Sequence, residues 1–292
     1  MGQKDIAEKI LEEYNDVFAD IVNALIFGGK QIVDPDDLET ASSLSAYKAD
    51  EKIRSLDRDV AKYWKHGRIR IAFAGLENQT VRDKYMPLRV ISYDGNEYRK
   101  QYSDKSNDSV IYPVVTLVLY FGKEKWNYPK NVCGLVDIPE GFEPFVSDYK
   151  MNLFEIAYLS EEQLDLFKSD FRIVAEYFVQ TRVSSEYKPT PQTIRHVGAV
   201  FQAMSAFTGD KRFEEMQELS SGERRINMCE ALDIIENRGI KKGFEQGIEK
   251  GIEKGRLALL IELVKEGEMS VETAAKKENM TVEEFKAVAK LN

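Results

Sequence analysis

Apolar and polar residues alternate along two neighbouring segments in the first third of the chain, and this alternation predicts a β-hairpin. The segments run from 56 to 65 and from 68 to 79, and His66-Gly67 between them is suited to a turn. One face of the second segment carries Ile69, Ile71 and Phe73. The period of two places Glu77 on the same face, so a carboxylate ends an otherwise apolar row.

The pattern elsewhere predicts a mixed α/β domain. Helical spacing is found at 7–27 and 86–101, a continuous β-branched apolar run at 110–121 is typical of a buried central strand, and 149–156 suits an edge strand. The expected order is therefore helix, strands, helix, strand. Ser160-Glu161-Glu162 is a helix start signal, so we expect this first domain to end at residue 158.

Asp59 and Glu77 are the candidate chemical pair, because the hairpin places them on adjacent strands. Two carboxylates close together at the end of a half-buried strand repel each other and lose solvation unless a cation satisfies them. Hard oxygen ligands suit Mg²⁺ or Mn²⁺, ions that support phosphodiester cleavage. The alternative is structural: Asp59 pairs with Arg58 or Lys62, and Glu77 with Arg89, as charges near strand ends commonly do.

The chain resembles a known family in four ordered blocks. They are 18–25 (FADIVNAL), 58–62 (RDVAK), 75–80 (GLENQT) and 86–94 (MPLRVISYD). Together they resemble the PD-(D/E)XK transposases, a group similar to the recombination-promoting nuclease (Rpn) proteins. The resemblance implies a restriction-endonuclease-like αβββαβ core and an activity as a metal-dependent DNA endonuclease.

The resemblance also implies roles for particular residues. Asp59 and Glu77 would hold the metal, and Gln79 takes the position where a lysine usually orients the attacking water. Such folds often add an acid from the first helix, for which Asp20 is the candidate and Asp16 the alternative. A neutral amide at Gln79 cannot offset developing negative charge as an ammonium can, so turnover is expected to be slow unless another lysine substitutes.

Net charge is −9, which is unfavourable for binding a polyanion, but the balance reverses locally. Seven basic residues and only two acidic ones lie between 52 and 70, and further basic residues and tyrosines follow up to 100. The expected DNA contacts are Arg58, Lys62, Lys84 and Arg89. Without the neighbouring motif, a solvated strand edge protected by lysines would explain this stretch equally well.

Composition restricts the remaining chemistry. The two cysteines, Cys133 and Cys229, form no CxxC pair, and two histidines are too few for a histidine-rich metal site. The amino terminus mixes charges where a signal peptide needs an apolar core, and no apolar run is long enough to span a membrane. These features predict a cytoplasmic protein.

The rest of the chain has helical spacing. A helical domain is expected at 159–236, with Thr190-Pro191 as the cap of a helix over 192–207. In the tail, 237–292, glycine recurs every fourth residue from 239 to 255, followed by short helices with capping boxes at Ser270 and Thr281. Such a glycine row suits homo-oligomerisation through close helix contact, or else a spacer.

Two rival functions follow. The first is a catalytically weak or inactive relative that keeps the fold and binds DNA, and the second is an interaction protein that acts through its glycine-rich tail. The short capped helices look like a helix-turn-helix, but their many glutamates argue against reading DNA.

Overall fold

The structure, a computed structural model, describes residues 11–41, 44–49, 52–57, 60–75, 83–103, 111–184, 187–210, 212–219 and 226–290. The chain divides into two compact units, Met1–Ala231 and Leu232–Asn292. The sequence had suggested boundaries at 158 and 236; the structure instead groups the sheet and the following helices in one unit.

The first unit is built on a five-stranded mixed sheet in the order β1-β4-β5-β6-β7. Its strands are β1 (Leu38–Thr40), β4 (Val60–Trp64), β5 (Ile69–Gly75), β6 (Val114–Tyr120) and β7 (Asn152–Glu155). The first three pair antiparallel, whereas β6 runs parallel to β5 and β7 parallel to β6. The predicted hairpin, central strand and edge strand are therefore confirmed.

Not every strand was predicted from the sequence. The predicted strand 56–65 is two strands: β3 (Lys52–Asp57) pairs with β2 (Leu44–Ala49) in a separate two-stranded sheet, and only the part from Val60 onward joins the main sheet. Alternation alone does not reveal which partner a strand takes, because both halves satisfy the same period of two.

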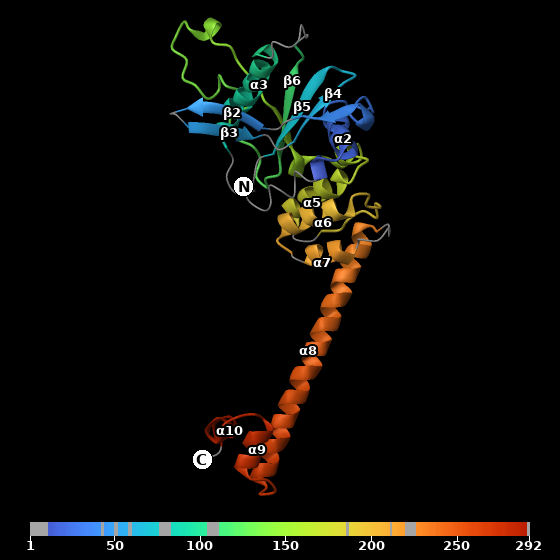
Figure 1. Cartoon of the computed structure of the whole chain (residues 1–292), viewed down its shortest axis with the longest axis vertical. Helices are drawn as coiled ribbons and strands as arrows, with labels where there is room; N and C mark the ends of the chain where they lie inside the picture. The colour runs from blue at the N-terminus through green and yellow to red at the C-terminus, as the bar shows by residue number, and fades with distance from the viewer. Residues whose placement is uncertain are drawn as a thin grey trace. The chain divides into compact units, whose positions relative to one another are not determined.

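Two helices cover opposite faces of the main sheet (Figure 1). Residues of even number on β6 face α3 (Met86–Ser103), since Thr116 Oγ1 donates to Asp94 of this helix. Lys62 of β4 faces α2 (Asn15–Leu25), and its ammonium lies 5.7 Å from the centroid of the Phe18 ring. Helix α2 ends two residues before the end predicted for the first helix, and it is followed by Gly28 and Gly29, whose φ angles of 60° and 85° do not continue a right-handed helix. The predicted start at residue 7 lies outside the described residues.

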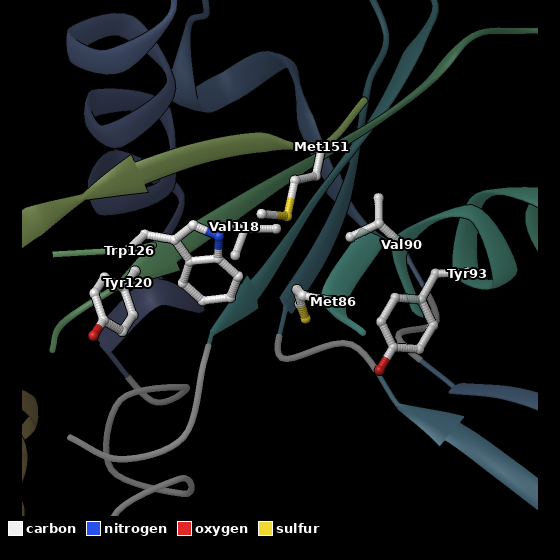
Figure 2. Close-up of a cluster of buried hydrophobic side chains, with 7 residues drawn as sticks. All are labelled: Met86, Val90, Tyr93, Val118, Tyr120, Trp126 and Met151. Carbon is white, nitrogen blue, oxygen red and sulfur yellow. The ribbon is translucent and has the colours of Figure 1, made fainter. Parts of the chain in front are cut away.

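Apolar side chains from α3 fill the space over β6. Figure 2 shows the buried cluster, in which α3 contributes Met86, Val90 and Tyr93 and the sheet side contributes Val118, Tyr120, Trp126 and Met151. Five of these side chains are large aromatic or thioether groups, which supply much of the apolar area that holds α3 on the sheet.

The helices after the sheet share its core. They are α4 (Glu161–Leu164), α5 (Phe171–Val183), α6 (Val197–Thr208) and α7 (Arg212–Leu219). Phe121, which follows β6 directly, packs against Phe171, Phe178 and Phe207. This aromatic contact explains why the helices and the sheet form one unit.

The predicted start of the helix over 192–207 was wrong. Helix α6 begins at Val197, because Thr190 is bonded to Glu176 through its hydroxyl and Thr193 forms a β-bridge with Asn227. Both contacts hold the preceding residues in an extended conformation. Helix α4 begins at the predicted helix start, where Ser160 and Gln163 form a capping box.

The second unit consists mainly of α8 (Met228–Lys265), α9 (Val271–Lys277) and α10 (Val282–Ala289). A small core of Leu260, Ala274, Ala275, Phe285 and Ala289 joins the three helices. The capping box predicted at Thr281 is confirmed at the start of α10, whereas Ser270 caps α9 by accepting the backbone N–H of Thr273, without the second bond of a capping box. All five glycines of the repeat lie within α8, at a cost of about 1 kcal/mol each relative to alanine in an isolated helix.

Candidate functional site

Strand pairing brings together the two chain segments that flank the predicted acids. Strand β4 begins where β5 ends, because Val60 is the register partner of Phe73 in the antiparallel pair. Asp59 directly precedes β4 in sequence, and Glu77 follows the last residue of β5 by two positions. Asp59, Glu77, Gln79 and Arg58 themselves lie outside the described residues, so the structure gives the ends of the strands beside them and not their side chains.

The same edge of the sheet receives other elements. Strand β6 ends beside β5, with Leu119 opposite Gly75. Helix α3 begins at Met86, only eleven residues after the end of β5, and runs back across the sheet. The carboxyl ends of β5 and β6 and the amino end of α3 thus surround the position expected for the acids. In α/β sheets this is a common place for ligand sites.

A polar cluster marks the first turns of α3. Arg89 donates from Nη1 to Asp83 Oδ2 at 3.2 Å and from Nη2 to the Tyr93 hydroxyl at 3.0 Å. Asp83 Oδ1 also accepts the backbone N–H of Tyr85 at 2.9 Å. Burial alone lowers the pKa of Arg89, but Tyr93 and Asp83 more than compensate and raise it. The guanidinium is therefore held in place as a permanent cation.

The cations of this cluster remain accessible. The side chain of Arg89 is 44% exposed. Lys84 is exposed, and its ammonium lies 4.7 Å from the centroid of the Tyr85 ring, which is itself exposed. Two of the four predicted DNA contacts thus lie together at the surface, at the start of α3.

Lys62, the third predicted DNA contact, lies in the interior. It is 2% exposed, and its ammonium donates to the backbone oxygen of Glu13 at 2.8 Å. Burial lowers the pKa of this lysine, an effect that the nearby Glu13 charge partly opposes. In this arrangement Lys62 anchors the chain beside α2 and presents no ammonium to a phosphate.

The acids of α2 are bonded to the part of the chain that contains α4 to α7, which we term the helical segment. Asp20 is 5% exposed, and its Oδ2 accepts the backbone N–H groups of Lys168 at 2.8 Å and Ser169 at 2.7 Å. Asp16 lies 2.9 Å from Nε2 of His196 and 2.9 Å from Nη1 of Arg195. Both carboxylates thus connect α2 to loops of the helical segment.

These loops border a cavity of about 330 Å³. Asp16, Asp20 and Asp170 contribute to its lining. Burial raises the pKa of Asp170, although the backbone N–H groups of His196 and Arg195 oppose the shift. Across the ranges that the structure covers, no group of three histidine, cysteine or acidic residues is arranged to hold a metal ion.

Neither Asp83 nor Tyr93 was predicted from the sequence as a partner of Arg89. The signal for Tyr93 was available, because Arg89 and Tyr93 are four residues apart on a predicted helix and therefore lie on one face. His196 gave no such signal, since its partner Asp16 is 180 residues away in the chain.

Comparison with known families gives a match over residues 37–208 to the family described as "Putative transposase, YhgA-like". The matched region begins just before β1 and ends with the last residue of α6, so it includes the whole main sheet and most of the helical segment. No curated protein and no solved structure matches the chain. Among the helices that the structure describes, none has the length and apolar character needed to cross a membrane.

Proposed function

We propose, because this chain belongs to the YhgA-like transposase family, that it is a metal-dependent DNA endonuclease of the PD-(D/E)XK type that acts in the cytoplasm. The proposed substrate is DNA and the proposed reaction is phosphodiester hydrolysis.

The order and pairing of the elements support this proposal most strongly. Helix α2 is followed by the antiparallel strands β1, β4 and β5, then by α3, then by β6 parallel to β5. That is the αβββαβ order expected of a restriction-endonuclease-like core, with the β2–β3 hairpin inserted between β1 and β4. In this core the acids would come from the edge at which β4 begins and β5 ends, as Asp59 and Glu77 do in sequence.

The donor set suits a hard cation. Asp59 and Glu77 would supply carboxylate oxygens, which fit Mg²⁺ or Mn²⁺ better than softer metals. A bound ion of this kind would lower the pKa of a water molecule and stabilise charge on the phosphate. Gln79 would orient the attacking water by a hydrogen bond, and Arg89 and Lys84 would hold the DNA backbone at the start of α3.

Asp20 differs from the other acids proposed for the site because its carboxylate is already partly bonded. One of its carboxylate oxygens already accepts two backbone N–H groups, so as a further acid of the site it would act through Oδ1. That oxygen is buried, and it has no hydrogen-bond partner among the residues that the structure describes.

A second candidate function is DNA binding without efficient turnover, which the neutral Gln79 favours. The two functions differ in one measurement, the nicking of supercoiled plasmid by the purified protein with Mg²⁺ or Mn²⁺ and with a chelator. The endonuclease proposal expects nicking that needs the metal and is lost in both Asp59→Ala and Glu77→Ala. Asp137→Ala, which removes an exposed carboxylate from a loop, is the matched control and should cleave normally. Equal nicking by the wild type and both site variants would refute the assignment, whereas DNA binding without nicking would select the second function.

A further inference from the structure

Helix α8 carries four parallel rows of residues between 239 and 256, because its sequence repeats every fourth residue. The first row consists of Gly239, Gly243, Gly247, Gly251 and Gly255. Apart from the adjacent backbone of α8 itself, a methyl group built on any of these glycines would meet no atom of the described residues within 4 Å. The glycines are thus not required by any packing within the part of the chain that the structure describes.

The second row is apolar and exposed. Each glycine but the last is followed by a large apolar residue, and the exposed fractions are 63% for Ile240, 68% for Phe244, 48% for Ile248 and 65% for Ile252. Single exposed apolar residues are ordinary, but a contiguous row of this kind marks an interaction surface. The glycine row and the apolar row lie side by side along α8, the long orange helix of Figure 1, and form one face that we term the Gly-Ile face.

The two flanks of the Gly-Ile face have opposite charge. Successive residues of a helix are 100° apart, so the residue two before a glycine and the residue three after it lie on opposite sides of the face. From Glu245 onward, one flank carries Glu245, Glu249 and Glu253, and the other carries Lys250 and Lys254. At the start of the repeat the separation is incomplete, because Lys241 lies on the first flank, and Lys242 and the neutral Gln246 lie on the second. Gln246 belongs to the same row as these lysines, but near Gly247 it lies about 150° from the middle of the Gly-Ile face and therefore on the outer side of the helix.

We propose that the Gly-Ile face binds the same face of a second copy of this chain, with the two helices parallel. Rows of residues four apart form ridges inclined to the helix axis, and two such ridges interlock when the helices cross at about 50°. Glycines at the crossing let the two backbones approach closely while the isoleucine and phenylalanine side chains pack across it. The contact would offset the helix-breaking tendency of five glycines, for which the chain itself offers no compensation among the described residues.

Charge selects the parallel orientation and a second copy as the occupant. When two identical faces meet in parallel, the glutamate flank of each helix lies against the lysine flank of the other. Opposite charges therefore face each other on both sides of the crossing. In an antiparallel pair each flank would meet its own kind, and like charges would face each other. The face is therefore complementary to itself in only one orientation.

The proposal is tested by the association state of the full-length protein, measured by sedimentation velocity across a range of concentrations. We expect a dimer whose dissociation constant rises at least tenfold in Gly247→Leu. This substitution favours the helix but holds the backbones apart. The matched control is Gln246→Leu, which adds the same side chain on the outer side and should leave the constant within twofold. Circular dichroism of both variants verifies that helix content is retained.

Salt and charge reversal test the orientation. Raising the salt concentration should weaken the dimer, because screening removes attraction in a parallel pair. The triple variant Glu245→Lys, Glu249→Lys, Glu253→Lys should be monomeric alone. It should form a mixed dimer with Lys242→Glu, Lys250→Glu, Lys254→Glu. A monomer at every concentration, an unaffected Gly247→Leu protein, or a dimer strengthened by salt would each overturn the proposal. None of these readouts depends on DNA cleavage, so they stand apart from the test of the endonuclease function.

Discussion

Arg70 of β5 and Glu97 of α3 form an ion pair in the interior, with 2.6 Å between Nη1 and Oε1 and side-chain exposures of 7% and 3%. Tyr112 also donates its hydroxyl to the same Glu97 oxygen at 3.4 Å. The pair joins the strand that precedes Glu77 to the helix that follows it. It therefore fixes the two supports of the candidate site relative to each other.

Breaking this pair on one side should destabilise the protein strongly. In Glu97→Gln the buried guanidinium loses its counter-charge, and we expect the free energy of unfolding to fall by about 3–5 kcal/mol. Urea denaturation followed by circular dichroism measures the change. The control is Glu39→Gln, which breaks the exposed pair between Lys65 and Glu39 and should cost no more than about 1 kcal/mol. Similar losses in both variants would show that the interior pair contributes no more to the free energy of unfolding than the exposed pair.

Arg89 should contribute to DNA affinity and Lys62 should not. Removing one phosphate contact in Arg89→Ala is expected to weaken binding to all sequences and to reduce the slope of log affinity against log salt by about 1. Lys62→Met keeps the length of a buried side chain and should leave both quantities unchanged. Fluorescence anisotropy with labelled duplex DNA at several salt concentrations compares the two. A larger loss in Lys62→Met than in Arg89→Ala would contradict the surface assignment.

Gln79→Lys should increase the rate of cleavage if Gln79 occupies the position proposed for it. An ammonium there offsets negative charge that develops on the phosphate, and we expect a gain of about tenfold or more in the single-turnover rate. The control is the same substitution at Gln101, near the carboxyl end of α3, where the amide is bonded to the backbone of Tyr112. It adds a lysine away from the end of α3 at which the site is proposed. An increase in Gln101→Lys alone would point to general electrostatic attraction of DNA instead.

Acid should destabilise the protein partly through Asp16. Its partial burial raises the pKa, but hydrogen bonds and charges from His196 and Arg195 prevail and lower it below the ordinary 3.8. A carboxyl group with a lowered pKa in the folded state stabilises the fold above its unfolded pKa and loses this contribution as the pH falls through the folded pKa. We therefore expect wild type to lose more stability than Asp16→Asn between about pH 4 and pH 2. Asp170, whose pKa is raised by burial, changes stability in the opposite direction but is present in both proteins. Parallel acid-unfolding curves for the two proteins would show that Asp16 contributes nothing to the pH dependence.

Elements with a local sequence pattern were predicted correctly, whereas contacts between residues far apart in the chain were not predicted. The hairpin turn near Gly67, the buried strand β6 and the helix α3 follow from periodicities of two and 3.6 within a few residues. The family resemblance rested on the same short blocks, and the family match bears it out. By contrast, the burial of Lys62 depends on α2 lying over the sheet, and nothing near position 62 in the sequence signals this.

The acids of the first helix show the same difference between local patterns and long-range contacts. Helical spacing correctly placed Asp16 and Asp20 on one face, four residues apart. It did not reveal what the face would meet, because their partners Lys168, Ser169 and His196 come from loops far along the chain. Asp59, Glu77 and Gln79 remain predictions, since they lie outside the residues that the structure describes.

The four-residue period of α8 has a consequence for how this segment can change in length. Within 247–254 the unit Gly-Ile-Glu-Lys occurs twice in succession. Inserting or deleting one whole unit would move everything beyond it by about 6 Å along the axis and turn it by about 40°, yet every residue type would stay in its own row. An insertion of one residue would instead shift the glycines beyond it into the apolar row, and an insertion of two or three residues would shift them into charged rows. The length of this segment can thus change in steps of four residues while its pattern of faces is kept.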